Sequence, residues 1–293
     1  MSDSGSKQMR NLYTNPDRYM KTFQEFLRLS NEHQVMSEWI TARITTFVPA
    51  AQNDKSFSIL GIGSGSGEMD LNILTSLMKQ HPKIHNCVIE PNHQQMDKYR
   101  SLVERHREIL KNVNFDWNEQ TMENYAHSSS KQTRFDLIHV IQMLYYVDDP
   151  EATILELYQN RLKVGGVLVI IHVSDDGGWD KLWQKFGKLL PQSDQCNYIT
   201  GRAIQQILEK HKIRYENRQL PSYFNITDCF HGNQEIGNLL LDFITEVDNF
   251  VSEAPEDLQK EVLNYLLSED CSCKEDDKII FKNDLQVFII TRE

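Results

Sequence analysis

Between residues 57 and 172, short apolar runs alternate with amphipathic patterns of helical period. Residues 57–62 (FSILGI) and 135–140 (FDLIHV) are typical of buried strands, because both are short and rich in branched or aromatic side chains. Strands that alternate with helices form parallel βαβ units. The pattern predicts strands over residues 57–62, 87–89, 113–117, 135–140 and 167–172, and helices over residues 69–79, 94–109 and 151–161.

The rest of the chain adds elements before and after this alternating region. Beyond residue 172 the alternation stops, and the segment 222–283 suggests helices and loops, with an acidic, cysteine-bearing loop at 268–277. The further elements that we expect are helices over 17–29, 35–48 and 201–211, and strands over 213–220 and 285–291 (LQVFIIT). We therefore predict an α/β fold with a doubly wound, mostly parallel, seven-stranded sheet and a smaller helical cap.

A glycine-rich loop, GIGSGSG at residues 61–67, overlaps the end of the first predicted strand. Glycines let the backbone turn sharply and approach a ligand closely. A dinucleotide loop, G-x-G-x-x-G, would need a glycine at Ser66 or at Glu68, so that class of cofactor fits poorly. A G-x-G-x-G loop before a helix that opens with Glu68 and Asp70 suits S-adenosylmethionine better, since this cofactor has no phosphate that needs a helix N-terminus.

An acid, Glu90, follows the second predicted strand in the sequence VIEP. A carboxylate at the end of this strand can accept hydrogen bonds from both ribose hydroxyls of a nucleoside. The simpler alternative is a surface acid beside a helix. Because Glu90 and the glycine loop end successive strands, the two together favour a cofactor that contains adenosine.

Three groups of aromatic residues are candidates for a ligand chamber. Tyr145 and Tyr146 follow the fourth strand, while Trp179 and Trp183 share one helical face, as do Tyr19 and Phe23. Each pair alone suggests ordinary core. Together they could surround a sulfonium methyl group and a cationic amine. The polar candidates near them are Glu32, Gln142 and Asn283.

Charge and composition exclude several other classes of function. The 293 residues carry a net charge of −11 and no basic stripe, which argues against binding of nucleic acid. No apolar run is long enough to span a membrane, and the N-terminus lacks the apolar core of a signal peptide. Five scattered cysteines favour reduced thiols in the cytoplasm. Cys271 and Cys273 lack further ligands at zinc spacing, so we expect no metal site.

Several of these stretches carry a resemblance to the histamine N-methyltransferases, a family of class I S-adenosylmethionine-dependent methyltransferases with a Rossmann-like fold. The most specific strings are IQMLYYV at 141–147 and GWDKLW at 178–183. The other strings that carry the resemblance are RYMKTF at 18–23, NEHQ at 31–34, GSGSGEMDLNIL at 63–74, EP at 90–91, FDLIHV at 135–140, QCNYIT at 195–200 and FKN at 281–283.

The resemblance implies a monomeric enzyme that methylates the imidazole ring nitrogen of histamine by direct in-line transfer and leaves S-adenosylhomocysteine. It implies that Gly63, Glu90, Gln95 and Ile141 bind the cofactor. The substrate residues that it implies are Tyr19, Phe23, Glu32, Gln142, Tyr145, Tyr146, Trp179, Trp183, Cys196, Phe243 and Asn283, among which Glu32, Gln142 and Asn283 are the catalytic candidates that fix the polar ends of the substrate. Cys196 is expected to be a wall rather than a nucleophile.

The change of pattern after residue 172 also suggests domain boundaries. Residues 1–174 would form the N-terminal helices and the cofactor-binding domain, 175–200 and 222–282 a substrate-binding cap over the carboxyl edge of the sheet, and 201–221 with 283–293 the return to the α/β domain.

One position departs from the family. Met122 stands where the family has a serine on the adenine side of the cofactor, and Gln120 or Thr121 could replace that serine. Two alternatives stay open on the sequence alone: a paralogue that methylates another small imidazole or amine, and a protein that binds S-adenosylmethionine without catalysis.

Overall fold

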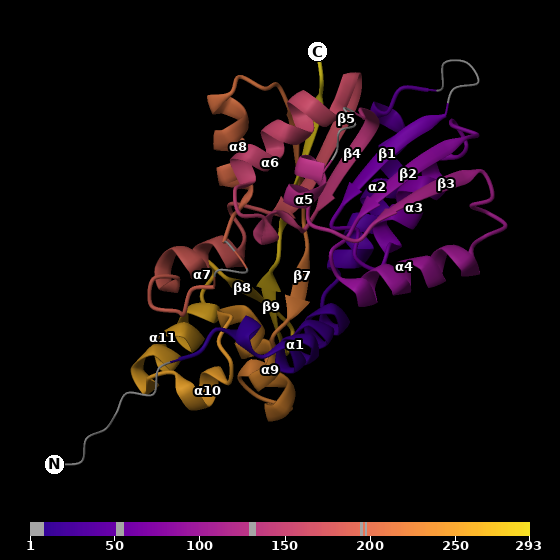
Figure 1. Ribbon diagram of the computed structural model, residues 1–293. Coiled ribbons are helices and arrows are strands. Elements are labelled where there is room, and N and C mark those ends of the chain that lie inside the picture. The colour runs from indigo at the N-terminus through magenta and orange to yellow at the C-terminus, as the bar shows by residue number, and fades with distance from the viewer. Residues whose placement is uncertain (1–8, 51–55, 129–132, 194–195, 197) are drawn as a thin grey trace. The chain divides into compact units, whose positions relative to one another are not determined.

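The computed structural model describes residues 9–50, 56–128, 133–193, 196 and 198–293 (Figure 1). Gln195 and Asn197 of the QCNYIT string lie outside the described residues. The chain divides into two compact units. Unit 1 is drawn from residues 1–35, 173–196 and 220–285, and unit 2 from residues 36–172, 197–219 and 286–293. Each unit is described by itself.

Unit 2 is built on a seven-stranded sheet with the strand order β3-β2-β1-β4-β5-β10-β6. Parallel pairs join β1 to β2, β1 to β4, β2 to β3 and β4 to β5. The strands are β1 (Phe57–Ile62), β2 (Ile84–Ile89), β3 (Val113–Asn118), β4 (Phe135–Ile141), β5 (Leu162–Val173), β6 (Glu216–Leu220) and β10 (Leu285–Thr291). The predicted doubly wound, mostly parallel sheet is confirmed.

Strand β10 runs against its neighbour. The Gly165 N–H donates to the Arg292 carbonyl at 2.8 Å, and the Arg292 N–H donates to the Gly166 carbonyl at 3.0 Å. The start of β5 therefore faces the end of β10, which is an antiparallel pairing. This pairing also explains why β5 begins before the predicted strand 167–172 and includes Gly165 and Gly166.

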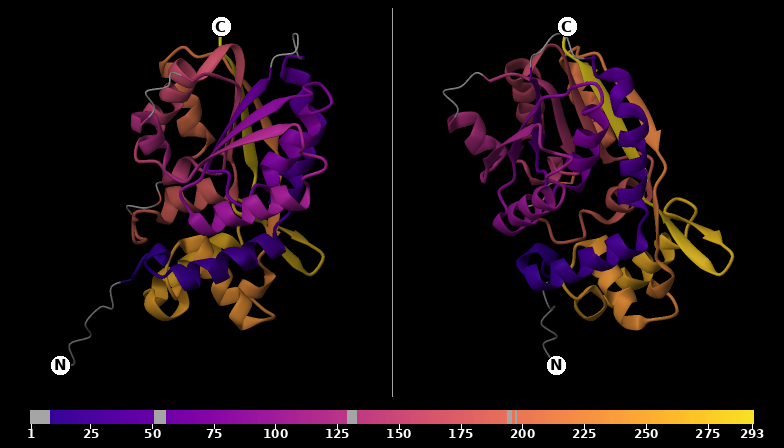
Figure 2. Two further views of the ribbon diagram at one scale, coloured as in Figure 1. Left: turned by 45° about the vertical axis from the view of Figure 1, so that its right-hand side comes forward. Right: turned by 90° about the vertical axis from the view of Figure 1, so that its right-hand side faces the viewer.

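Helices cover both faces of this sheet (Figure 2). They include α2 (Glu32–Phe47), whose first turn belongs to unit 1, together with α3 (Glu68–Leu77), α4 (His93–Arg105), α5 (Met122–Ser128), α6 (Pro150–Leu155) and α8 (Gly201–Lys210). The single helix expected over 151–161 is instead α6 followed by a π-helical segment, η3 (Glu156–Arg161). In the part of the chain that the structure describes, no helix has both the length and the apolar character needed to cross a membrane.

Unit 1 gathers short helices from three parts of the chain. The first, α1 (Pro16–Leu29), begins as the sequence predicts, because the Asn15 side chain accepts from the Arg18 N–H and Pro16 occupies the first turn. The other helical segments of unit 1 are η1 (Leu12–Thr14), α7 (Gly178–Phe186), η4 (Thr227–Cys229), α9 (Gln234–Thr245), α10 (Phe250–Glu253) and α11 (Glu256–Leu266).

A three-stranded antiparallel sheet in unit 1 corrects our expectation for residues 222–283. Its order is β7 (Tyr223–Asn225), β9 (Lys278–Lys282) and β8 (Ser272–Glu275). The segment expected as an acidic loop is mostly a hairpin, closed by a two-residue turn in which Asp276 has a φ of 52°. Strands of three to five residues are too short to show a clear alternation in the sequence, and their pairing is not local.

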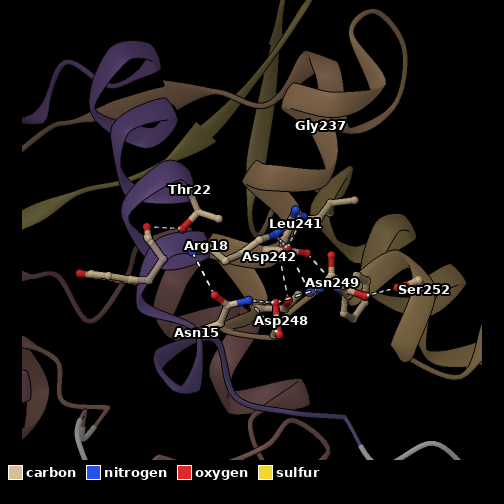
Figure 3. Close-up of polar contacts among 12 residues, drawn as sticks. Asn15, Arg18, Thr22, Gly237, Leu241, Asp242, Asp248, Asn249 and Ser252 are labelled. Atoms are coloured by element: carbon tan, nitrogen blue, oxygen red, sulfur yellow. Dashed lines mark hydrogen bonds and ion pairs between the residues drawn. The ribbon is translucent and has the colours of Figure 1, made fainter.

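An ion pair holds α1 against α9 (Figure 3). The Arg18 side chain lies 2.6 Å from Asp242 Oδ2 and donates to the same oxygen through Nε at 2.7 Å. Asp242 also accepts from the backbone N–H groups of Asn249 and Phe250 at 3.1 and 2.8 Å. Because the Asp242 carboxylate is fully buried and satisfied in this way, it fixes the two helices that carry Tyr19, Phe23 and Phe243.

Candidate functional site

The glycine loop in unit 2 is held by close backbone contacts. Gly63 and Gly67 have φ values of 64° and 86°. A Cβ on Gly63 would lie 2.8 Å from the Met143 side chain, and one on Gly67 would lie 2.1 Å from the Tyr99 ring. Gly65 differs, because its φ is 55° but a Cβ there would meet no heavy atom within 4 Å. The loop therefore packs on the protein at Gly63 and Gly67 and leaves open space at Gly65.

Glu90 lies against the open part of the loop. Its Oε2 accepts from the Gly65 N–H at 2.8 Å, and its Oε1 accepts from the Asn92 N–H at 2.9 Å. Burial raises the pKa of Glu90, and these two backbone donors oppose that shift. A carboxylate has about four lone-pair sites, so each oxygen can still accept another donor.

Gln95 and Ile141 complete the expected cofactor residues of unit 2. The Gln95 N–H donates to Asn92 Oδ1 at 3.1 Å, and the Asn92 side chain thereby caps the N-terminus of α4. Its side-chain Oε1 is buried and has no hydrogen-bond partner among the described residues. Ile141 is the last residue of β4 and is half-buried.

The residues after β4 form a second polar group in unit 2. Gln142 has a φ of 49°, and its N–H donates to the Ile171 carbonyl at 2.9 Å. The Tyr145 hydroxyl donates to Gln142 Oε1 at 3.0 Å. The Tyr145 ring lies 4.1 Å from the buried His172 ring, and burial lowers the pKa of His172 to about 3. Tyr146 is 51% exposed and packs edge to face on Tyr145.

Met122, predicted to stand at the position of the family serine, is a core residue. It packs in the apolar cluster that contains Leu60, Ile62 and Val140. Thr121 Oγ1 accepts from the Asn124 N–H at 3.3 Å, so this hydroxyl caps α5. Whether Gln120 or Thr121 replaces the serine stays a prediction.

Unit 1 contains an aromatic cluster, which we define as Tyr19, Phe23, Phe26, Trp179, Phe224, Phe243 and Phe281. Tyr19 stacks on Phe23 at 5.9 Å, and Phe23 lies 6.1 Å from Phe243. Phe243 in turn packs edge to face on Trp179 at 5.9 Å. Helices α1, α7 and α9 thus bring together four of the expected substrate residues, which are Tyr19, Phe23, Trp179 and Phe243.

The expected polar residues of unit 1 form a buried chain of hydrogen bonds. Trp179 Nε1 donates to Asn283 Oδ1 at 2.6 Å, and Asn283 Nδ2 donates to Glu32 Oε2 at 2.8 Å. Asn283 Nδ2 also donates to Ser222 Oγ at 3.2 Å. All four of these side chains are buried. Two of the three catalytic candidates, Glu32 and Asn283, are therefore in direct contact.

Local hydrogen bonds place Glu32 at this point. Asn31 Oδ1 accepts from Ser222 Oγ at 3.1 Å and from the Tyr223 N–H at 2.8 Å. The Asn283 N–H donates to the Ser222 carbonyl at 2.9 Å. The residue before α2 is therefore hydrogen-bonded to the start of β7, and the residue before β7 is hydrogen-bonded to the residue after β9. The sequence does not reveal the roles of Asn31 and Ser222, since neither forms part of a periodic pattern.

The remaining expected residues of unit 1 are Trp183 and Cys196. Trp183 is buried one turn after Trp179 on α7. Cys196 Sγ lies 4.0 Å from Glu246 Oε1, and burial raises the pKa of this thiol to about 12. Whether these residues meet Gln142, Tyr145 and Tyr146 of unit 2, as the sequence predicts, stays a prediction.

Comparison with known proteins identifies the class of this fold and site. Residues 16–214 match the family model described as a methyltransferase domain. The YcgJ protein from Bacillus subtilis has a similar fold, with a TM-score of 0.56 and 14% identity over 87% of this chain and 99% of that chain. The glycine loop and Glu90 lie within the matched residues.

Two curated relatives define the family more closely. Histamine N-methyltransferase of Bos taurus is 39% identical over 96% of this chain and 98% of its own length. The enzyme of that name from Xenopus tropicalis is 40% identical over 99% of this chain and 100% of its own length. The chain therefore belongs to the histamine N-methyltransferase family.

Proposed function

We propose that this protein transfers a methyl group from S-adenosylmethionine to the imidazole ring nitrogen of histamine and leaves S-adenosylhomocysteine. Membership of the histamine N-methyltransferase family supports this activity and favours it over a paralogue with another amine substrate and over a protein without catalysis. The structural observation that carries the substrate assignment is the buried chain of hydrogen bonds Trp179–Asn283–Glu32 beside the aromatic cluster.

The residues of unit 2 fit S-adenosylmethionine. We propose that Glu90 accepts from the ribose hydroxyls, since both of its oxygens keep accepting capacity. Gln95 Oε1, buried and without a partner among the described residues, suits a donor on the adenine ring. Gly63 and Ile141 would line the cofactor, and the open space at Gly65 leaves room for it. When bound, this cofactor supplies an activated methyl group on a sulfonium, which is a good leaving group.

The protein's own task in such a transfer is to hold the substrate nitrogen in line and to exclude water. The aromatic cluster supplies flat apolar walls, and Glu32 supplies a carboxylate that can accept from an imidazole N–H. Both N–H groups of Asn283 are engaged by Glu32 and Ser222, so Asn283 orients the Glu32 carboxylate, and its oxygen, which accepts from Trp179, can accept one more donor. The residues that we propose to contact the substrate are Tyr19, Phe23, Glu32, Gln142, Tyr145, Tyr146, Trp179, Trp183, Cys196, Phe243 and Asn283.

Gln142 is the third catalytic candidate. Its carbonyl oxygen accepts from Tyr145, so its amide N–H groups are oriented by that bond. We propose that this amide holds a second polar atom of the substrate. The left-handed backbone of Gln142 supports a functional role, because non-glycine residues in that region are rare outside constrained positions.

Direct transfer needs no covalent intermediate with the protein. The pKa of Cys196, raised to about 12 by burial, keeps this side chain a neutral thiol at physiological pH. Cys196 is therefore suited to be a wall of the substrate site rather than a nucleophile.

The organisation that goes with this function is also a proposal. We propose that residues 175–200 and 222–282 form the substrate-binding cap, and that residues 1–174, 201–221 and 283–293 form the cofactor-binding part. A cytoplasmic monomer that binds neither nucleic acid nor membrane accords with the net charge of −11 and the five free cysteines.

A methyl-transfer assay over a panel of small molecules tests the proposed function. The panel contains histamine, other imidazoles, several biogenic amines and nicotinamide, each with S-adenosylmethionine. We expect the highest kcat/KM for histamine, with product methylated on the ring. Preference for another member would make the protein a paralogue, and cofactor binding without turnover of any member would favour the non-catalytic alternative.

A further inference from the structure

Glu246 carries a carboxylate and is not among the site residues expected from the sequence. It ends α9 one turn after Phe243, with a left-handed φ of 53°. Its backbone carbonyl accepts from the Leu12 N–H at 2.8 Å, which ties the residue to η1. A left-handed conformation is unfavourable for a residue that has a Cβ atom, so the surrounding contacts hold Glu246 in place.

The contacts around Glu246 lead back to the aromatic cluster. Glu246 Oε1 lies 4.0 Å from Cys196 Sγ, and the Tyr13 side chain hydrogen-bonds to the same thiol. The Tyr13 ring lies 4.9 Å from Tyr19, which belongs to the cluster. Glu246 is therefore connected to the aromatic cluster in two ways: it follows Phe243 by one turn at the end of α9, and it contacts Cys196, which contacts Tyr13. These contacts connect Glu246 to the Tyr19 side of the aromatic cluster.

Among the described residues, Glu246 lacks the cationic partner that its neighbours have. Asp242, one turn earlier, pairs with Arg18 at 2.6 Å (Figure 3). Asp248, two residues later, pairs with Arg10 at 3.1 Å. Within the described part of the chain, no Lys, Arg or His forms an ion pair with Glu246. Burial alone raises the pKa of Glu246 to about 7. A carboxylate kept in such a place without a cation is a candidate for binding one.

We propose that Glu246 is the counter-charge for the ammonium group of the substrate, while Glu32 serves its imidazole ring. The two carboxylates lie at different ends of a continuous path: Glu246 is one turn from Phe243, Phe243 packs on Trp179, and Trp179 is joined through Asn283 to Glu32. Two acids separated by aromatic side chains suit a ligand with a polar nitrogen at each end of a short apolar skeleton. This inference rests on the proposed function, since the cation is that of the methylated amine.

The test compares histamine with 4-ethylimidazole, which has the same ring and two carbons but no amine. The variant Glu246→Gln keeps the size and removes the charge. The matched control is Glu235→Gln, on the exposed first turn of the same helix. Assays run at pH 8, where the Glu246 carboxylate is largely ionised and an alkyl ammonium is still protonated.

We expect Glu246→Gln to lower kcat/KM for histamine about 10- to 100-fold, as for loss of a charged hydrogen bond. In the same variant, kcat/KM for 4-ethylimidazole should stay within about twofold of the wild-type value. In Glu235→Gln, kcat/KM for each of the two substrates should also stay within about twofold of the wild-type value. An equal loss for both substrates, or a loss for neither, would overturn the assignment of Glu246 to the ammonium. Absence of turnover of either substrate by the wild-type protein would instead overturn the proposed function, and this inference with it.

Discussion

The side-chain amide of Asn283 donates a hydrogen bond of 2.8 Å to the carboxylate of Glu32, 251 residues away in the sequence. The direction of this bond follows from the other partner of the amide. Trp179 Nε1 can only donate, so Asn283 must turn its oxygen toward Trp179 and its nitrogen toward Glu32. With Ser222 accepting from the same nitrogen, both amide hydrogens of Asn283 are engaged, so the side chain holds Glu32 in place while its oxygen keeps one accepting site.

Replacing Asn283 should therefore affect both stability and substrate recognition. Asn283→Ala leaves the Trp179 N–H buried without an acceptor, and we expect a loss of about 2–4 kcal/mol in the free energy of unfolding. Urea denaturation measures this loss. The matched control is Asn264→Ala, at an exposed position on α11, where the change should stay within about 0.5 kcal/mol. Equal stability of the two variants would contradict the role of Asn283.

Glu32→Gln tests the carboxylate itself. A glutamine oxygen can still accept from Asn283, so the fold should be kept while the charge is lost. We expect kcat/KM for histamine to fall by an amount equivalent to about 1–3 kcal/mol, with nearly constant affinity for S-adenosylmethionine. Steady-state kinetics and calorimetry measure the two quantities. An unchanged kcat/KM would exclude Glu32 from substrate recognition.

Glu90→Ala should weaken binding of the cofactor. Loss of two charge-assisted hydrogen bonds to the ribose predicts binding of S-adenosylmethionine weaker by about 2–4 kcal/mol. Glu104→Ala, at an exposed position on α4 of the same unit, is the control and should leave the affinity unchanged. Titration calorimetry compares the two, and equal affinities would remove Glu90 from the site.

Gly65 offers a sharper test of the glycine loop. Gly65→Ala meets no protein atom within 4 Å, so it should lower stability only by the roughly 1–2 kcal/mol of a left-handed alanine. The matched control is Gly165→Ala in β5, where φ is also positive and the surrounding space is also open. We expect both variants to melt at similar temperatures, with weaker binding of S-adenosylmethionine in Gly65→Ala only. Similar cofactor affinity in both would mean that the open space at Gly65 is not occupied by the cofactor.

The pKa of Glu246 predicts a dependence of stability on pH. Because burial raises this pKa to about 7, the folded protein binds more protons than the unfolded chain between the ordinary pKa of 4.5 and pH 7. The contribution of Glu246 to the free energy of unfolding is therefore fully present below about pH 4.5 and is lost as pH rises through 7, with a total loss of about 3 kcal/mol. Glu246→Gln should stabilise the protein at pH 8 but not at pH 5. Denaturation of both proteins at both pH values measures the difference, and a pH-independent effect would contradict this origin.

The fold of unit 2 could be predicted from local patterns. Strand β1 agrees with the predicted residues 57–62, and β10 with 285–291, because each strand is one apolar run bounded by polar or glycine residues. Where bounds moved, as at β2 and β5, the added residues pair with a neighbouring strand. Gly165 and Gly166 joined β5 through hydrogen bonds to Arg292, which lies 127 and 126 positions away by residue number.

The sequence by itself determined the alternation of strands and helices, the glycine loop and the acid that follows β2, since these depend on residues close together in the chain. Only the tertiary structure decided that Asn283 holds Glu32 and that β7, β8 and β9 form a sheet. It also decided that, among the described residues, Asp242 and Asp248 have cationic partners and Glu246 does not. Hydrogen-bond partners and burial depend on which groups pack against one another in the folded protein. A periodic pattern in the sequence gives no information about partners that lie far apart along the chain.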